Sequence, residues 1–118
     1  MRWTIEVTAV FEQWWMELSQ DEQVSIDSIM RVLEVHGPDV ALYSGRIAGS
    51  RYPQLRQLRI PHDGRLLCVL CLCEELRATL VLLSGTRSTA ADACATEPAG
   101  HADAEYESYL AVMNRGPH

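Results

Sequence analysis

The chain begins with alternating hydrophobic and polar positions and then changes to a helical spacing. Residues 3–7 alternate apolar and polar side chains, which is the pattern of a strand with one buried face. Phe11, Trp14, Trp15 and Leu18 then recur at intervals of three and four, so they share one face of a helix. We expect this face to lie in the core, both tryptophans included, rather than to stack on nucleic-acid bases.

A second helix is predicted directly after the first. Ser19 followed three residues later by Glu22 is a capping box, in which each side chain binds the backbone N–H of the other residue. The apolar residues between 26 and 33 again recur at helical spacing, and Gly37-Pro38 ends the element. Because almost nothing separates the two helices, we expect them to pack as an antiparallel hairpin.

The second half predicts three strands. After a turn-rich stretch at 39–53, residues 55–60 form a short strand, and a turn signal at 61–64 leads into the apolar run 65–73. A second apolar run at 76–83 returns beside the first as a hairpin covered on both faces.

The last element predicted is a helix that follows a loop of small and polar residues at 88–101. Tyr106, Tyr109, Leu110 and Met113 share one face of this helix. The order β-α-α-β-β-β-α indicates an α+β fold on a mostly antiparallel sheet. We expect one domain over residues 1–118, because a chain of this length has room for one core.

Targeting signals are not evident in the sequence. The longest apolar run, at 66–73, is far shorter than the ~18 residues that cross a bilayer. An acid, Glu6, stands where a signal peptide continues apolar. We therefore expect a cytoplasmic protein that does not enter a membrane.

The cysteines at 68, 71 and 73 resemble a metal site until they are placed on a strand. Cys71 and Cys73 then point to one face and Cys68 to the other, so the three cannot converge on a tetrahedral zinc ion. We expect buried, reduced core cysteines, no metal site and no cofactor.

Charge is unevenly distributed along the chain, whose net charge is −6. Residues 1–45 carry two arginines against eight acids, and residues 88–118 carry one against five. The basic middle segment, residues 46–87, carries seven arginines against three acids, for a balance of +4. All ten basic residues are arginine, whose planar fork of donors matches a phosphate group. High genomic GC content would also favour arginine, but it does not explain the clustering.

This order of elements and charges resembles the RelE/HigB-type toxins of bacterial toxin–antitoxin systems, particularly their phage-derived HigB-like branch. The resemblance covers almost the whole chain, and each motif is weak alone. The segments that carry it are Phe11-x-x-Trp14-x-x-x-Leu18, Gly37-Pro38, Arg46-Ile47-x-Gly49-Ser50-Arg51, Leu55-Arg56-Gln57-Leu58-Arg59, Leu82-Leu83-x-Gly85-x-Arg87 and Ala102-Asp103-x-x-Tyr106-x-x-x-Leu110.

The resemblance implies a toxin that cleaves mRNA on the ribosome without a metal and so inhibits translation. It also implies a cognate antitoxin of the helix-turn-helix type, which we expect to bind across the basic middle segment. In such cleavage the RNA 2′-OH attacks the phosphate, so the site needs a proton acceptor and cations for the charge that develops.

Carried over to this sequence, the resemblance makes Arg56, Arg59 and Arg87 catalytic candidates, with Arg46 and Arg51 as RNA-binding residues of the loop. Two departures weaken the case for activity. The position of the family's usual strand arginine falls on Cys68, and the stretch 88–94 lacks the family's basic and aromatic residues.

Two further candidates come from the sequence itself and not from the resemblance. Arg65 is a substitute for the lost strand arginine, and His62 is a candidate acid or base. Alternation along a strand also puts Arg56 and Arg59 on opposite faces. Two readings stay open: an active endoribonuclease, and a binding module with this fold that has lost catalysis and acts through protein partners.

Overall fold

A computed structural model describes residues 2–38, 44–47, 49–88 and 99–114, to which all statements below refer. Most of the polar stretch 88–101, which includes the fourth cysteine, Cys94, lies outside them, as do residues 115–118. The elements are β1 (Thr4–Val7), α1 (Ala9–Glu17), α2 (Gln20–His36), β2 (Ser44–Arg46), β3 (Leu55–His62), β4 (Arg65–Glu74), the 3-10 helix η1 (Glu75–Arg77), β5 (Thr79–Ser88) and α3 (Ala99–Asn114). The expected α+β fold is confirmed.

The helix boundaries follow from local side-chain chemistry. Thr8 caps α1, and its hydroxyl accepts a hydrogen bond from the Phe11 N–H at 3.1 Å. Ser19 and Glu22 form the predicted capping box, with reciprocal hydrogen bonds of 3.1 and 2.9 Å. Gly37, at φ 75°, ends α2 in a backbone conformation that favours glycine.

Within the described residues, the sheet has five strands in the order β1-β5-β4-β3-β2. Only β1 runs parallel to its neighbour, and the other pairs are antiparallel. The turn between β3 and β4 is the two-residue Asp63-Gly64, both at positive φ, so β3 continues through Pro61 and His62, which were expected in the turn. The edge strand β2 was not expected, and β5 runs to Ser88 rather than stopping at 83.

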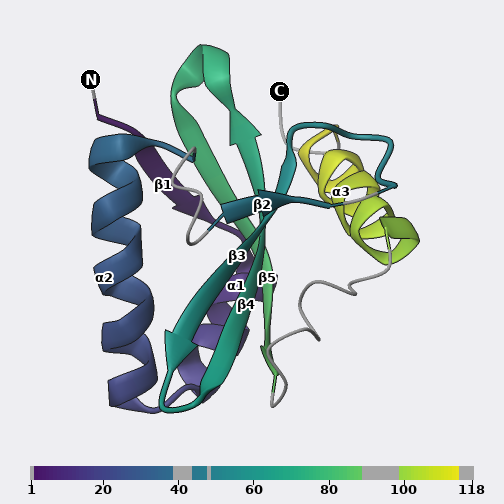
Figure 1. The fold of residues 1–118 in the computed structure, drawn as a ribbon. Coiled ribbons are helices and arrows are strands. Elements are labelled where there is room, and N and C mark those ends of the chain that lie inside the picture. Colours follow the sequence, from purple (N-terminus) through teal and green to yellow (C-terminus); the bar gives the residue numbers. More distant parts are fainter. Residues whose placement is uncertain (1, 39–43, 48, 89–98, 115–118) are drawn as a thin grey trace.

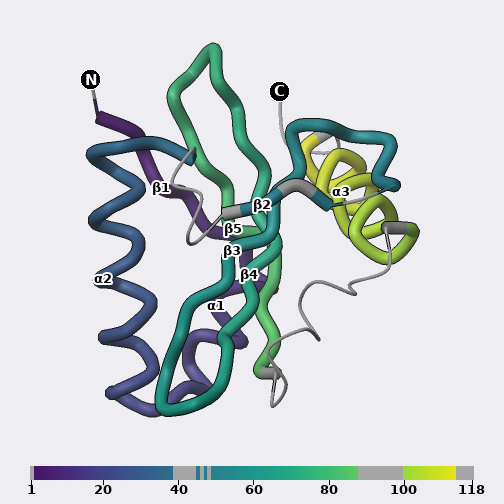
Figure 2. Tube along the Cα trace, viewed as in Figure 1, coloured from purple at the N-terminus to yellow at the C-terminus, as the bar shows by residue number. Residues whose placement is uncertain are grey.

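Helices cover both faces of the sheet, and the ribbon shows α2 on one side and α3 on the other (Figure 1). The tube view gives the same arrangement (Figure 2). We name these the α1–α2 face and the α3 face. The core on the α1–α2 face consists of Phe11, Leu18, Ile26, Ile29, Met30, Leu33, Leu58, Ile60, Leu67, Val69, Cys71, Cys73, Leu80 and Leu82. The core on the α3 face consists of Ile47, Leu55, Leu70, Leu72, Val81, Leu83, Ala102 and Tyr106.

A bulge in β5 changes which residues face each layer. The pairing of β4 with β5 shifts between Leu70 and Cys71, so that Leu83 packs in the α3-face core and Ser84 binds Glu105 of α3. Two consecutive residues therefore point to the same side. Beyond the bulge the alternation is reversed, and both Gly85 and Arg87 face α1 and α2.

The tryptophans and the last helix depart in part from expectation. Trp14 and Trp15 are only half-buried, although both pack against the larger core. The Trp14 ring lies over Gly85, where a Cβ atom would overlap it. On α3, Ala102 and Tyr106 are buried as one face, but Met113 is 57% exposed, so the predicted apolar face is buried only in its first half.

The cysteines lie as predicted on β4, with Cys71 and Cys73 buried on the α1–α2 face and Cys68 buried on the opposite face. Neither Cys71 nor Cys73 forms a disulfide. Cys68 is disulfide-bonded, which corrects the expectation of reduced cysteines at that position; its partner lies outside the described residues. None of the described helices is long and apolar enough to span a membrane.

Candidate functional site

Three of the predicted site residues lie together where the hairpin of β3 and β4 meets the end of β5. His62 and Arg65 are register partners on either side of the Asp63-Gly64 turn, so their side chains share a face. The β5 bulge turns Arg87 to that same α1–α2 face, opposite Leu67. The result is a cavity of about 350 Å³, the hairpin pocket, lined by Ser19, Asp21, Glu22, His62, Asp63, Arg65 and Arg87.

Arg87 is held in this pocket by the capping-box glutamate of α2. Its Nε and Nη2 donate to the two carboxylate oxygens of Glu22 at 2.7 and 2.8 Å, and Nη2 also reaches the Glu17 carbonyl at 3.3 Å. Glu22 is buried at 7% exposure, whereas the Arg87 side chain is 42% exposed. Arg87 therefore presents only the outer part of its guanidinium to a ligand.

The contact shifts the pKa of both groups. The hydrogen bond from Arg87, followed by the one with Ser19, lowers the pKa of Glu22 from 4.5 to about 2. The hydrogen bond to Glu22 in turn raises the pKa of Arg87. Both partners are thus charged throughout the physiological range.

His62 is oriented by a residue of α2. Its Nδ1 lies 2.7 Å from the Oγ of Ser25, and the two form a hydrogen bond whose direction depends on the tautomer of the ring. If Ser25 accepts, Nε2 carries the lone pair of a base; if Ser25 donates, Nε2 carries a proton. Ser25 thus fixes the ring and leaves Nε2 for proton transfer.

The charges around the pocket limit what it can bind. Asp21, Glu22 and Asp63 contribute three carboxylates against the two guanidinium groups of Arg65 and Arg87. The Glu22–Arg87 pair is internally neutral. A phosphate would therefore meet Arg65, the outer edge of Arg87 and His62, with Asp21 and Asp63 opposing it.

The structure separates Arg56 and Arg59 from this pocket and from each other, as alternation predicted. Arg56 points to the α1–α2 face near the end of α2, where its Nη1 donates to the Pro38 carbonyl at 3.3 Å. It lines a different cavity, of about 320 Å³. Arg59 lies on the other face beside Gly45, where a Cβ atom would come 2.8 Å from its Nη2. The Arg46 backbone pairs with Arg56, and its side chain lies outside the described set.

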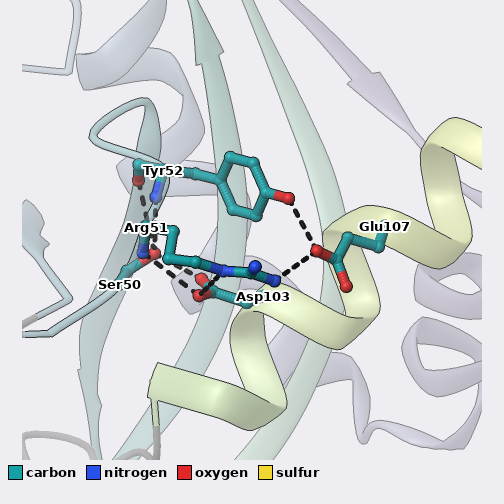
Figure 3. Close-up of polar contacts among 5 residues, drawn as sticks. All are labelled: Ser50, Arg51, Tyr52, Asp103 and Glu107. Atoms are coloured by element: carbon teal, nitrogen blue, oxygen red, sulfur yellow. Dashed lines mark hydrogen bonds and ion pairs between the residues drawn. The ribbon is translucent and has the colours of Figure 1, made fainter.

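Arg51 lies in a network that ties a loop to α3 (Figure 3). Its guanidinium binds Glu107 at 2.5 Å, and its backbone N–H donates to Asp103 at 3.1 Å. The Ser50 hydroxyl donates to Asp103 at 2.5 Å, and the Tyr52 hydroxyl donates to Glu107 at 2.6 Å. We call these five residues the α3 clamp. Within it, Arg51 forms ion pairs with two acids of its own chain, Asp103 and Glu107.

Two pKa shifts reflect this network. The hydrogen bond from Ser50, above all, lowers the pKa of Asp103, and the hydrogen bond to Glu107 raises the pKa of Tyr52.

Sequence reasoning missed two residues of the site. Ser25 carries no local signal, because it lies 37 positions from His62 and reads as an ordinary helix residue. Glu22 was identified as a capping residue, but its second role as the partner of Arg87 depends on the β5 bulge. In the described part of the chain, no group of three or more His, Cys, Asp or Glu side chains could hold a metal ion.

No protein-family model matches the sequence, and no curated protein matches it. The fold does match solved structures. A doubly substituted E. coli RelE toxin in the free state matches with a TM-score of 0.63 at 8% identity, over 93% of this chain and 99% of that one. The chain has a RelE-type fold.

Two toxin–antitoxin complexes extend this likeness. The RelE–RelB complex of Pyrococcus horikoshii matches with a TM-score of 0.55 at 10% identity, over 77% of this chain and 99% of that one. The RelBE complex of Mycobacterium tuberculosis matches with a TM-score of 0.57 at 12% identity, over 76% of this chain and 95% of that one. At these identities the likeness shows the RelE-type fold alone, and membership of the HigB-like branch stays a prediction.

Proposed function

We propose that this chain is the toxin of a toxin–antitoxin pair and that it cleaves mRNA on the ribosome at the hairpin pocket. The observation that carries the proposal is the placement, on a RelE-type fold, of a histidine fixed by Ser25 beside Arg65 and Arg87. The RelE proteins of the matched complexes are bound to antitoxins, and a cognate antitoxin, of the helix-turn-helix type, belongs to the proposal.

The residues of the pocket suit attack by the RNA 2′-OH on the adjacent phosphate. His62 accepts the 2′-OH proton through Nε2, with Ser25 accepting the hydrogen bond from Nδ1. Arg65 and the outer edge of Arg87 neutralise the charge that grows on the phosphate oxygens. The bond to the 5′ oxygen breaks as the new bond to the 2′ oxygen forms, and water supplies the proton for the leaving group. No residue of the pocket is assigned as that acid.

A second candidate is a binding module that keeps the fold and acts only through protein partners. It is favoured by the internal pairing of three arginines of the basic middle segment: Arg51 with Glu107, Arg77 with Glu74, and Arg87 with Glu22. The carboxylates of the hairpin pocket favour it as well. This candidate predicts that the wild-type chain is not toxic.

Induced expression in bacteria separates the two candidates, with growth and the 5′ ends of mRNA as readouts. A toxin should arrest growth and create new 5′ ends, and co-expression of the gene next to it should restore growth. His62→Ala should reduce cleavage by about 10²–10⁴-fold, the usual contribution of an acid–base group. Arg65→Ala should reduce it by about 10²–10³-fold, as for other charge-stabilising groups.

Arg31→Ala is the matched control, because Arg31 is an exposed arginine of α2 paired with Asp27 outside the pocket. It should leave cleavage unchanged. Arg56→Ala and Arg59→Ala test the wider set: if they abolish cleavage while His62→Ala and Arg65→Ala do not, the active site lies elsewhere on the fold. A non-toxic wild type would leave the binding module as the better account.

A further inference from the structure

An apolar groove lies between the start of α1 and the second half of α3, and it shares no lining residue with the hairpin pocket. Its volume is about 480 Å³, and its floor is Val81 and Leu83 of β5. Its lining includes Glu6, Val7 and Val10 on one side and Glu105, Val112 and Met113 on the other. We call this the α1–α3 groove.

Large apolar side chains on the walls of this groove face solvent. Val10 on α1 is 64% exposed, and Val112 and Met113 on α3 are 67% and 57% exposed. Together with Val7 they form a continuous apolar lining, unlike the scattered exposed apolar residues that any surface carries. Contiguous apolar surface of this kind marks a protein-binding site more often than an accident of composition.

The charge on the rim of the groove indicates the charge of the partner that it would bind. Among the described residues that line it, Glu6 and Glu105 are the only charged ones, and both are acids. Two bases of the described part of the chain reach this rim. Arg77 is shared between Glu6 at 3.4 Å and Glu74 at 2.7 Å, and the Nε2 of His101 lies 3.0 Å from the carboxylate of Glu105. The groove thus joins the two acidic ends of the sequence. An acidic rim around an apolar floor disfavours both an anionic membrane and a second copy of this acidic chain.

The shape of the groove favours a helix as the bound segment of the partner. Its two walls are helices, α1 with the preceding strand on one side and α3 on the other, over a floor of strand residues. An amphipathic helix fills such a groove with apolar side chains at every third and fourth position. Its flanking positions would then face Glu6 and Glu105, where lysine or arginine is favoured.

We propose that the α1–α3 groove binds a basic amphipathic helix of a partner protein. The inference needs neither RNA nor His62, and it holds for the nuclease and for the binding module alike. It places a partner on the acidic ends of the chain, whereas the sequence led us to expect the antitoxin on the basic middle segment.

Two model peptides with the same apolar face test the charge of the partner. One is an amphipathic helix of leucine and lysine, and the other replaces each lysine with glutamate. Titration into the full chain, followed by NMR of the methyl groups, should show binding of the lysine peptide with shifts at Val10, Val112 and Met113. Added salt should weaken this binding. Equal or tighter binding of the glutamate peptide, or no binding of either, would overturn the proposal.

A pair of valine variants tests the location. Val112→Asn should weaken the lysine peptide by about tenfold, the effect of losing a central apolar contact. Val24→Asn is the matched control, since Val24 is 58% exposed on α2 outside the groove. If Val112→Asn lowers the melting temperature of the protein, Val10→Asn on α1 can be used in its place, and it should weaken binding of the lysine peptide in the same way. Equal effects of the groove and control variants would contradict the site.

Glu105→Gln keeps the shape of the side chain that binds Ser84 and removes the charge. It should lower both the affinity for the lysine peptide and its dependence on salt. Two other outcomes would also overturn the proposal. If the wild type forms dimers that Val112→Asn abolishes, a second copy occupies the groove. If the wild type sediments with anionic vesicles and Val112→Asn does not, a membrane occupies it.

Discussion

The two faces of the sheet are attached to their helices by different kinds of contact. On the α1–α2 face, fourteen buried side chains form the core among the described residues, and the Glu22–Arg87 ion pair lies at its edge. On the α3 face the corresponding core has eight, and α3 contributes only Ala102 and Tyr106 to it. Polar contacts add to this attachment: those of the α3 clamp, and the hydrogen bonds from Ser84 to Glu105 and from Gln54 to Tyr106.

This difference bears on what each face can do. The proton-transfer role that we propose for His62 requires a fixed geometry, and His62 lies where α2 packs on the sheet and Ser25 fixes its ring. A docking surface needs apolar side chains that the fold leaves uncovered, and α3 leaves them uncovered because only its first half is buried. Substitutions on each face should therefore differ in what they change, stability and pH dependence on the α1–α2 face and local opening on the α3 face.

Leu33→Ala should have the largest effect on stability. Leu33 is fully buried between α2 and the sheet, so the substitution should lower the free energy of unfolding by about 2–5 kcal/mol. Urea denaturation measures the change. Val35→Ala, at a half-exposed position of the same helix, should cost less than about 0.5 kcal/mol. Similar losses for the two variants would mean that α2 is not the main attachment of this face.

Glu22→Gln should cause the second-largest loss of stability. It removes the charge of a buried carboxylate, but its partner Arg87 can still be solvated by water, which limits the loss. The expected loss is about 1.5–3 kcal/mol, the range for a hydrogen bond to a charged group. Since the pKa of Glu22 falls from 4.5 to about 2 on folding, the unfolded chain holds this proton more tightly. The stabilisation is therefore complete above pH 4.5 and is lost as the pH falls toward 2.

The pH dependence provides the check on Glu22→Gln. The variant should lose less stability than the wild type between pH 4.5 and 2, as followed by thermal melts. Asp27→Asn, which removes an exposed partner of Arg31, should leave the wild-type pH profile in place. A wild-type profile in the Glu22→Gln variant would show that the ion pair does not stabilise the fold.

Local chemistry explains which parts of the fold could be predicted. The caps at Thr8 and Ser19 and the turn at Asp63-Gly64 were predictable because each depends on residues within a few positions. The strand β2 was not, because three residues at a sheet edge are fixed by pairing with β3 and carry no pattern of their own.

The candidate site was less predictable than the fold, for reasons of geometry. Alternation along β5 from Leu82 would have sent Arg87 to the α3 face, and only the bulge at Leu83 and Ser84 turns it to Glu22. His62 was proposed from its residue type, but its hydrogen bond to Ser25 depends on how α2 packs on the hairpin. Arg51 was predicted to bind RNA, and nothing near it in the sequence indicated the acids of α3 that it contacts.

Ser50→Ala should have a smaller effect, confined to the α3 face. The Ser50 hydroxyl donates to Asp103 and accepts from the Tyr52 N–H at 3.1 Å, so the expected loss is about 0.5–1.5 kcal/mol. Hydrogen exchange should accelerate in α3 and not in α2. Ser28→Ala, which removes an exposed hydroxyl bound to the Val24 carbonyl, is the control and should change neither. Faster exchange in both helices would mean that the two faces open together.

Treatment with a metal chelator should have the smallest effect of all: the melting temperature should not change. Cys71 and Cys73 lie in the core of the α1–α2 face and Cys68 on the opposite face, so their sulfurs do not converge. Burial, above all, raises the pKa of the Cys71 thiol to about 12, and a protonated thiol is a poor metal ligand. Purified protein should contain no stoichiometric zinc, and EDTA should leave its melting temperature unchanged. Zinc that survives dialysis, or a melting temperature that falls with EDTA, would show that these cysteines bind metal and that the sheet is stabilised by more than its two cores.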